Sequence, residues 1–260
     1  MSLAALLRKR YYELIVKIKQ DRAAKLPYYG PLVRGWLGDA LYTDKTLYSV
    51  LFKNPSIDVR PFFFYTAKER DEIRLNMRFM GFSVHFVKEL VLSLGKNVES
   101  HLGGVPCRIE ALSYEEKEFA SNALERKIRV NFLSPSALVD GDTISVVPSL
   151  PQVTRALVRQ ANKFTKYYVK DVYPIRVGGV NDGTVTGFTI DSFFWRHRNV
   201  RGELMPLKGV WGFVEYVLED MTAETMDILR LAPFFQIGKW VSYGFGKIAV
   251  VAQQQEQTEK

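Results

Sequence analysis

The residues best suited to acid–base chemistry in this sequence are its three histidines. His197 stands between Arg196 and Arg198, and two flanking positive charges favour a neutral imidazole, which suits a general base. The same run can instead be a basic patch that contacts phosphate and carries out no chemistry. His85 lies near the start of an amphipathic helical stretch and is interpreted as a capping or half-buried residue, and His101 precedes a pair of glycines in a loop.

A glycine-rich stretch near the C-terminus, residues 236–248, combines glycines with cations and aromatic residues. Glycine allows a phosphate or another chain segment to approach the backbone closely, and a Trp or Tyr ring offers a surface on which a base can stack. Both a phosphate-binding loop and a tight connection between strands fit these features. Under the first interpretation the nucleic-acid contacts are Gly238, Lys239, Trp240, Tyr243, Gly244, Gly246 and Lys247.

A second set of cations lies on a predicted helix at residues 150–164. Arg155, Arg159 and Lys163 recur there at a spacing of four, which places them in one row along the helix. We expect this row to contact a nucleic acid. Solubilising surface charge is the alternative for these residues, and core packing is the alternative for Trp240.

Composition limits the classes of protein that fit. The chain has 260 residues, 47% of them hydrophobic, and a net charge of +8 with a pI near 9.4, which favours an anionic partner. Its single cysteine cannot form an intramolecular disulfide, and the histidines are too widely spaced for a zinc site. We therefore expect no metal or other cofactor, no membrane span and a cytoplasmic location.

The elements predicted in the first half have the order β-α-β-β-α-β. They are a strand at 11–19, a helix at 32–42 that continues or restarts towards 52, strands at 62–65 and 73–79, a helix at 83–94 and a strand at 108–112. A charged hairpin loop is expected at 66–71, and a linker at 114–126.

The pattern restarts at residue 127. The elements predicted there are a strand at 127–132, a turn at 134–136, the helix at 150–164, strands at 172–177, 184–194 and 207–217, a helix at 222–231, and closing strands at 240 and 244–251. The sequence therefore predicts an α+β protein of two tandem ferredoxin-like domains, residues 1–122 and 123–260, the second with the glycine-rich loop.

Three segments of the second half together resemble one family. They are Asn-Phe-Leu-Ser-Pro at 131–135, the strand pair at 195–212 with Arg196, Arg198 and Gly209, and the loop at 237–248 with its Gly-Phe-Gly. They are similar to motifs of the CRISPR-associated repeat-processing endoribonucleases, which belong to the RAMP superfamily of tandem ferredoxin-like RNA-binding proteins. Residues 26–35 resemble a segment of related proteins more loosely.

The sequence departs from the family pattern at several positions. Gln236 stands where the loop of the family has its first glycine, and Lys208 stands in the place of the first glycine of a pair. Many members carry a catalytic histidine after the first strand, and residues 21–48 contain no histidine.

The resemblance implies cleavage of CRISPR repeat RNA to mature crRNA, without a metal ion and with a 2′,3′-cyclic phosphate product. In the region of the missing histidine it leaves Tyr29 and Lys25 as catalytic candidates beside His197. The further RNA contacts that we expect in the family-like segments are Arg34, Arg196, Arg198 and Lys208.

The expected partner is CRISPR repeat RNA or crRNA, and the resemblance also allows subunits of a CRISPR effector complex and a homodimer. The main alternative is a catalytically inactive RNA-binding RAMP protein or a subunit of such a complex. An unrelated α+β enzyme with a phosphate-binding glycine loop is disfavoured, because the sequence lacks a P-loop or dinucleotide-binding pattern.

Overall fold

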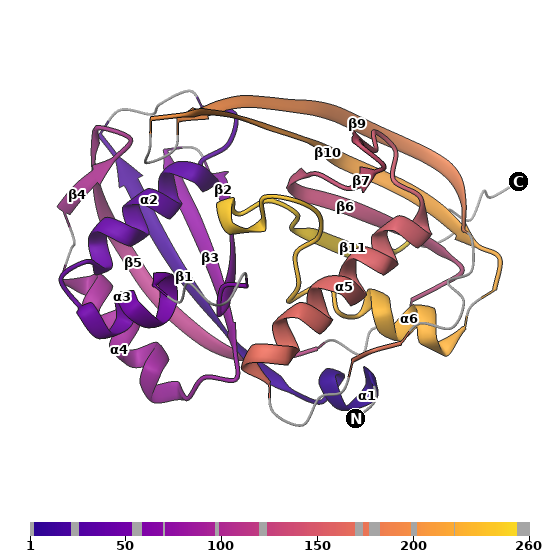
Figure 1. Ribbon diagram of the computed structural model, residues 1–260, viewed down its shortest axis with the longest axis horizontal. Coiled ribbons are helices and arrows are strands. Elements are labelled where there is room, and N and C mark those ends of the chain that lie inside the picture. Colours follow the sequence, from indigo (N-terminus) through magenta and orange to yellow (C-terminus); the bar gives the residue numbers. More distant parts are fainter. Residues whose placement is uncertain are drawn as a thin grey trace, which may run out of the picture.

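The computed structural model describes residues 3–21, 26–53, 59–69, 71–96, 99–119, 124–169, 174–176, 183–198, 202–220 and 222–253. The N-terminal and C-terminal halves of the chain lie side by side, and each contains a β-sheet with helices on one face (Figure 1). None of the helices in these described ranges combines the length and apolar character that crossing a membrane requires.

The first half forms an antiparallel sheet in the order β2-β3-β1-β5-β4. This is the ferredoxin-like order of strands, with the short β4 added as a hairpin at one edge. Alternate residues of β1 are buried against the helices, including Leu14, Val16 and Ile18, which explains the apolar alternation in the sequence. The elements of this half are α1 (Leu3–Leu7), β1 (Arg10–Gln20), α2 (Gly30–Leu41), α3 (Lys45–Phe52), β2 (Phe62–Glu69), β3 (Glu72–Met80), α4 (Val84–Gly95), β4 (Glu99–Leu102) and β5 (Val105–Glu118).

The second half repeats the arrangement in the sheet order β11-β6-β10-β9. Helix α5 begins with a capping box, in which Ser149 and Gln152 satisfy each other's backbone amides, and this explains why the helix starts where it does. The elements of this half are β6 (Lys127–Ser136), β7 (Val139–Asp140), β8 (Thr143–Ile144), α5 (Leu150–Tyr168), β9 (Gly183–Arg198), β10 (Leu204–Leu218), α6 (Ala223–Leu229), the 3-10 turn η1 (Val241–Tyr243) and β11 (Ile248–Ala252).

One apolar cluster joins the two halves. The ring of Phe234 lies 5.2 Å from Tyr11 and 5.3 Å from Phe63, both in the first half, and 5.3 Å from Phe164 on α5. All four rings are buried in the same core cluster, which also contains residues of α1, α6 and β6. A separate cluster fills the space between the first sheet and its helices α2, α3 and α4. The shared cluster fixes the position of one sheet relative to the other.

The predicted α+β, tandem ferredoxin-like fold is confirmed, with three local corrections. Strand β2 continues to Glu69, so the turn before β3 is shorter than the expected loop at 66–71. Strand β5 runs to Glu118, where a linker was expected, because its ladder with β1 continues as far as Arg10 opposite Glu118; Arg10 also forms ion pairs with Glu116 and Glu118. Residues 134–136 are strand and not turn, because the amide of Gly246 donates to the Pro135 carbonyl.

Two other predicted strands also differ. Trp240 precedes a 3-10 turn and is not in a strand. Of the strand expected at 172–177, only residues 174–176 are described, and they have no regular secondary structure.

Replacing Phe234 with alanine should destabilise the whole chain by about 3–5 kcal/mol, because it leaves a cavity in the cluster shared by both halves. Urea unfolding followed by circular dichroism should show a single transition in the wild type, shifted to lower urea in the variant. The matched control is Phe188→Ala, whose ring is 58% exposed and which should change the free energy of unfolding by less than about 1 kcal/mol. Two separate wild-type transitions would contradict the coupling.

Candidate nucleic-acid interface

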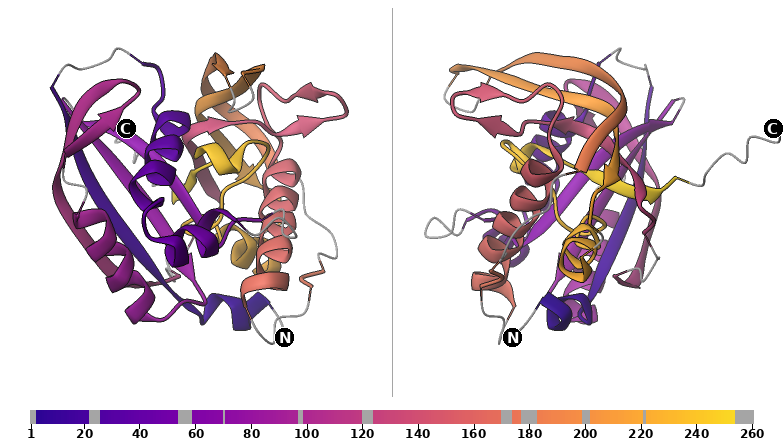
Figure 2. Two further views of the ribbon diagram at one scale, coloured as in Figure 1. Left: turned by 60° about the vertical axis from the view of Figure 1, so that its left-hand side comes forward. Right: turned by 90° about the vertical axis from the view of Figure 1, so that its right-hand side faces the viewer.

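The glycine-rich loop lies between the two halves of the molecule, close to α2 and β2 (Figure 2). The buried side-chain amide of Gln236 donates to the carbonyls of Phe64 (2.7 Å) and Gly244 (3.0 Å). The Tyr28 hydroxyl donates to the same Gly244 carbonyl at 2.6 Å. Gln236, where the family-like pattern has glycine, therefore attaches the loop to strand β2 of the first half.

Two of the loop glycines serve close packing within the protein. Gly244 and Gly246 are buried, both at φ +83°. A Cβ atom at Gly246 would lie 1.9 Å from the Ile237 carbonyl oxygen, and one at Gly244 would lie 2.6 Å from the Tyr28 hydroxyl. The prediction that these two glycines contact RNA is therefore corrected. Gly238 is exposed and remains available to a ligand.

The prediction that Lys247 contacts RNA is also corrected. Its ammonium donates to the carbonyls of Ala232 (3.1 Å) and Pro233 (2.8 Å) and is almost fully buried. Burial, together with the nearby Arg78, holds the pKa of Lys247 well below its ordinary value. This cation supports the interior of the loop and does not face solvent.

Three predicted residues from distant parts of the chain meet beside the loop. The His197 ring at the end of β9 lies 5.1 Å from the ring of Tyr243 in η1. The guanidinium of Arg34 on α2 lies 4.9 Å from the centroid of the same Tyr243 ring. All three side chains are partly exposed. An imidazole, a phenol and a guanidinium together can supply a base, an acid and a charge-stabilising group for phosphoryl chemistry.

The pKa of His197 is lowered from its ordinary value, first by burial and then by the positive charge of Arg34. The direction agrees with the sequence-based expectation, but the cause differs. Arg196 and Arg198 flank His197 on a strand, where successive side chains point to opposite faces. They are exposed, whereas His197 is partly covered. The imidazole is consequently biased towards the neutral form that a general base needs.

The other two catalytic candidates do not join this cluster. Tyr29 is 3% exposed and belongs to the core of the first half, which removes it from direct contact with a substrate. Lys25 lies outside the described residues.

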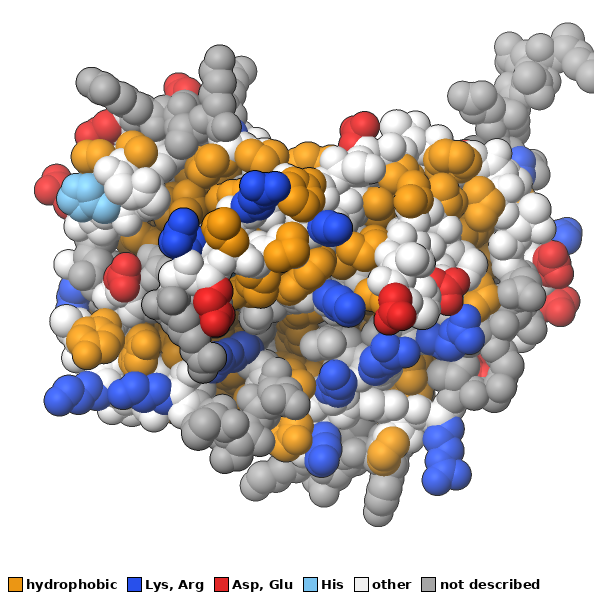
Figure 3. Space-filling view, turned by 45° about the horizontal axis from the view of Figure 1, so that its top comes forward, with side chains coloured by type: hydrophobic (Ala, Val, Ile, Leu, Met, Phe, Trp, Pro, Cys, Tyr) orange, Lys and Arg blue, Asp and Glu red, His pale blue; other side chains and the backbone are white. Residues whose placement is uncertain are grey.

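Three further cations predicted to bind RNA lie on β9 and β10, on the face of these strands opposite the His197 side chain. Arg196, Arg198 and Lys208 are exposed, and the ammonium of Lys208 lies 5.9 Å from the ring of Phe194. Lysine and arginine side chains intermingle with exposed apolar ones on the face drawn in Figure 3. Such a surface combines charge for phosphates with apolar area for bases.

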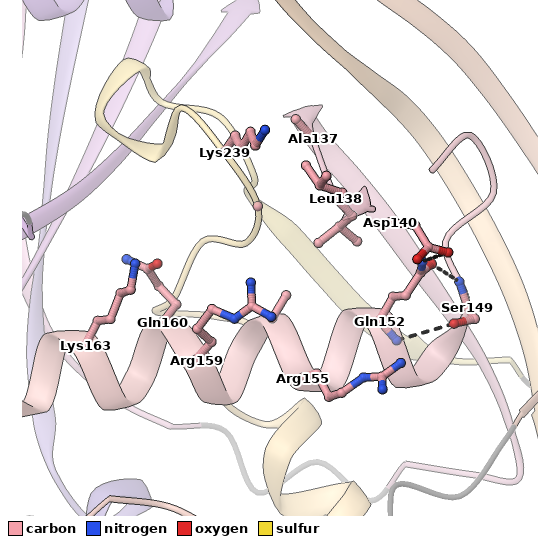
Figure 4. Close-up of a pocket in the computed structure, with 13 residues that line it drawn as sticks. Ala137, Leu138, Asp140, Ser149, Gln152, Arg155, Arg159, Gln160, Lys163 and Lys239 are labelled. Carbon is pink, nitrogen blue, oxygen red and sulfur yellow. Dashed lines mark hydrogen bonds between the residues drawn. The ribbon is translucent and has the colours of Figure 1, made fainter. Parts of the chain in front are cut away.

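The row of cations on α5 lines a cavity of about 520 Å³. Arg155, Arg159 and Lys163 project from the helix, and Lys239 of the glycine-rich loop lies on the opposite wall with Gly238 (Figure 4). The carboxylate of Asp140 also lines the cavity and accepts a hydrogen bond from Gln152. The cavity is therefore predominantly positive. Of the predicted RNA contacts, it unites Arg155, Arg159, Lys163, Gly238 and Lys239.

Gln160 of α5 lines this cavity and also a second, smaller cavity that Arg34 and Ser242 line. Arg60 lines the same small cavity, and its pKa is lowered by burial and by Arg34. Arg60 and Gln160 were not predicted from the sequence. Arg60 follows a stretch without clear periodicity, and Gln160 is neutral, so neither residue carried a local signal.

Among the described residues, no group of three or more His, Cys, Asp and Glu side chains could hold a metal ion.

The fold is that of tandem ferredoxin-like RNA-binding proteins. Residues 130–248 match the family model described as CRISPR-associated endoribonuclease Cas6, just under half of the chain. The C-terminal half thus carries the Cas6 sequence pattern, and the resemblance seen in the sequence is confirmed. No curated protein matches the sequence.

Solved Cas6 structures share the fold over nearly the whole chain. A Cas6 (TTHA0078) product complex has a TM-score of 0.64 at 16% identity, covering 94% of this chain and 100% of that chain. A Cas6 (TTHB231) product complex has a TM-score of 0.63 at 15% identity, with coverage of 93% and 100%. Cas6 (TTHB231) of Thermus thermophilus has a TM-score of 0.63 at 14% identity, with coverage of 94% and 99%.

Gly246→Ala should destabilise the protein by at least about 3 kcal/mol, because it adds a backbone clash to an unfavourable positive φ. Gly104→Ala is the matched control: its φ is +81°, and no neighbouring atom lies within 4 Å of its Cβ position. The control should lose only about 1–2 kcal/mol. Thermal and urea unfolding measure both. Equal losses would mean that the close contact with Ile237 is unimportant.

Arg34→Gln should raise the pKa of His197, because it removes a positive charge that disfavours the imidazolium form. Burial remains, so the pKa should stay below its ordinary value. NMR titration of the His197 ring in the free protein measures the shift without reference to activity. Arg155→Gln on α5 is the control and should leave the pKa of His197 unchanged. A His197 pKa that falls or does not move in Arg34→Gln would contradict the assigned cause.

Proposed function

We propose that the chain is a Cas6-type endoribonuclease that cleaves CRISPR repeat RNA without a metal ion and leaves a 2′,3′-cyclic phosphate. The observation that carries this proposal is the meeting of His197, Tyr243 and Arg34 beside the glycine-rich loop. The match of residues 130–248 to the Cas6 family and the Cas6 product complexes with the same fold support the assignment of the substrate.

In the proposed reaction, neutral His197 removes the proton from a ribose 2′-hydroxyl. The 2′-oxygen attacks the adjacent phosphorus, the P–O5′ bond breaks, and the products are a 2′,3′-cyclic phosphate and a 5′-hydroxyl. The guanidinium of Arg34 stabilises the charge that develops on the phosphate. The Tyr243 hydroxyl donates a proton to the leaving 5′-oxygen. The lowered pKa of His197 suits the first step, because a base must be unprotonated at working pH.

The α5 cavity is proposed to hold the RNA backbone away from the cleavage point. Arg155, Arg159 and Lys163 follow one another by about 6 Å along the helix axis, a spacing comparable to that of neighbouring phosphates on an extended strand. Lys239 adds a cation from the other wall. Gln160 lines both this cavity and the smaller one at Arg34, which supports an RNA path that passes from one to the other.

A non-catalytic RNA-binding protein is the second candidate. The absence of any histidine from residues 21–48, where many family members have one, favours it. The two candidates share the RNA surface and differ only in whether bound RNA is cut.

Labelled repeat RNA incubated with the protein in EDTA should be cut, and the 3′ end of the upstream product should be a cyclic phosphate. His197→Ala should slow cleavage by a factor of about 10² or more, because it removes the base. His101→Ala, an exposed histidine on β4, is the matched control and should cut normally.

Binding measured on the same RNA separates the candidates. Salt-sensitive binding without cleavage would support the non-catalytic protein, since several phosphate contacts make affinity fall steeply with salt. Equal cleavage by wild type and His197→Ala would remove His197 from the mechanism. Binding no stronger than to unrelated RNA would contradict the RNA assignment itself.

A further inference from the structure

Trp240 has a left-handed backbone conformation, which is sterically unfavourable for a bulky side chain. Its φ is +58° and its ψ is +25°, and it is the only residue other than glycine with a positive φ in the part of the chain that the structure describes. Bulky residues are disfavoured in this left-handed region, whereas glycine is accommodated readily. The same loop uses glycine for its other positive φ angles, at 238, 244 and 246. An indole retained at position 240 therefore indicates a role for the ring.

The indole is partly exposed at the edge of a buried aromatic cluster. Its ring meets that of Phe245 edge-on, with centroids 5.9 Å apart. Phe245 and Phe193, also in contact with each other, form the floor, and both are buried. Trp195 packs against the same cluster and is partly exposed as well. The loop thus holds one face of the aromatic cluster at the surface.

This aromatic edge lies next to the proposed cleavage site. The amide of Tyr243 donates to the Trp240 carbonyl at 2.8 Å, so the two residues bracket a single tight turn. Tyr243 contacts His197, and Trp195 lies 6.2 Å from His197 between ring centroids. A ligand on Trp240 is therefore within one nucleotide's reach of the proposed reacting phosphate.

The charges around the ring specify the occupant. Lys239 is its exposed neighbour in the chain, and the guanidinium of Arg34 lies over the ring of Tyr243 in the same turn. An aromatic face with cations beside it fits an anionic ligand that carries flat rings, which is a single-stranded nucleic acid. A base pair inside a duplex is excluded from such stacking because both of its faces are already covered.

We propose that Trp240 is a stacking subsite for one unpaired nucleobase of the bound RNA, adjacent to the phosphate that is cut. The proposal rests on the proposed RNA-binding function and adds to it a required single-stranded nucleotide. The ring contributes affinity independent of phosphate charge, whereas the α5 row contributes affinity that depends on salt.

The test compares Trp240→Gly with Trp240→Phe. Glycine accepts the left-handed conformation, so Trp240→Gly should fold with an unchanged or higher unfolding midpoint, yet bind single-stranded repeat RNA roughly five- to a hundredfold more weakly. The slope of log affinity against log salt should not change. Trp240→Phe should retain most of the affinity. Arg159→Gln on α5 should instead reduce the slope by about one.

A scan with single abasic nucleotides gives a second readout. One abasic position should weaken binding to the wild type and have little effect on binding to Trp240→Gly, because the stacking contact needs both the base and the indole ring. Wild-type tryptophan fluorescence should be quenched by the RNA, and the quenching should be lost in Trp240→Phe. Trp36→Phe, which removes an indole that is only 3% exposed, is the control and should keep the quenching.

The stacking subsite would be overturned if Trp240→Gly bound the RNA as tightly as the wild type and if no abasic position affected the two proteins differently. A lowered unfolding midpoint with unchanged fluorescence quenching would also overturn it, since the ring would then be structural only. In both cases salt-sensitive RNA binding by the wild type would leave the proposed function standing. Absence of such binding would overturn both.

Discussion

The carbonyl oxygen of Gly244 is the point on which the position of the glycine-rich loop between the two halves depends. It accepts hydrogen bonds from Tyr28, just before α2, and from Gln236, which also binds the backbone of β2. A buried carbonyl must be hydrogen-bonded, and here one donor, Tyr28, belongs to the first half and the other, Gln236, to the second. We call this contact region between the two halves the seam. These bonds hold the loop against the first half, so Tyr243 faces Arg34 and the predicted site is assembled.

Close approach at this seam leaves no room for side chains. The loop therefore has glycine at 244 and 246, where a Cβ would collide with the hydroxyl of Tyr28 and the backbone of Ile237. The one bulky residue with a positive φ in the described part of this loop is Trp240, and its side chain is partly exposed. Gly238 is constrained in the same way, because a Cβ there would lie 2.5 Å from the Ala137 carbonyl oxygen, although Gly238 itself is exposed.

Buried cations at the seam change how the net charge should be interpreted. Arg78 is fully buried and donates to the Pro233 carbonyl, which also accepts from Lys247. Burial lowers the pKa of both residues, and the negative charge of Glu13 acts in the opposite direction. Carbonyl oxygens offset part of the cost of removing such groups from water. The exposed positive surface is consequently built from other cations, those of α2, α5, β9, β10 and the outer part of the loop.

The sequence by itself determined the order of strands and helices, because periods of two and of about 3.6 residues in apolar residues reflect which face each element buries. It also located the glycine-rich loop, the row on α5 and a histidine with a lowered pKa. Only the tertiary structure decided that Lys247, Tyr29, Gly244 and Gly246 are buried, and that Arg34 rather than the flanking arginines acts on His197. The reason is physical. Local pattern specifies each element's own faces, whereas burial and electrostatic partners at the seam arise from contacts between segments far apart in the chain, which exist only once the two halves are docked.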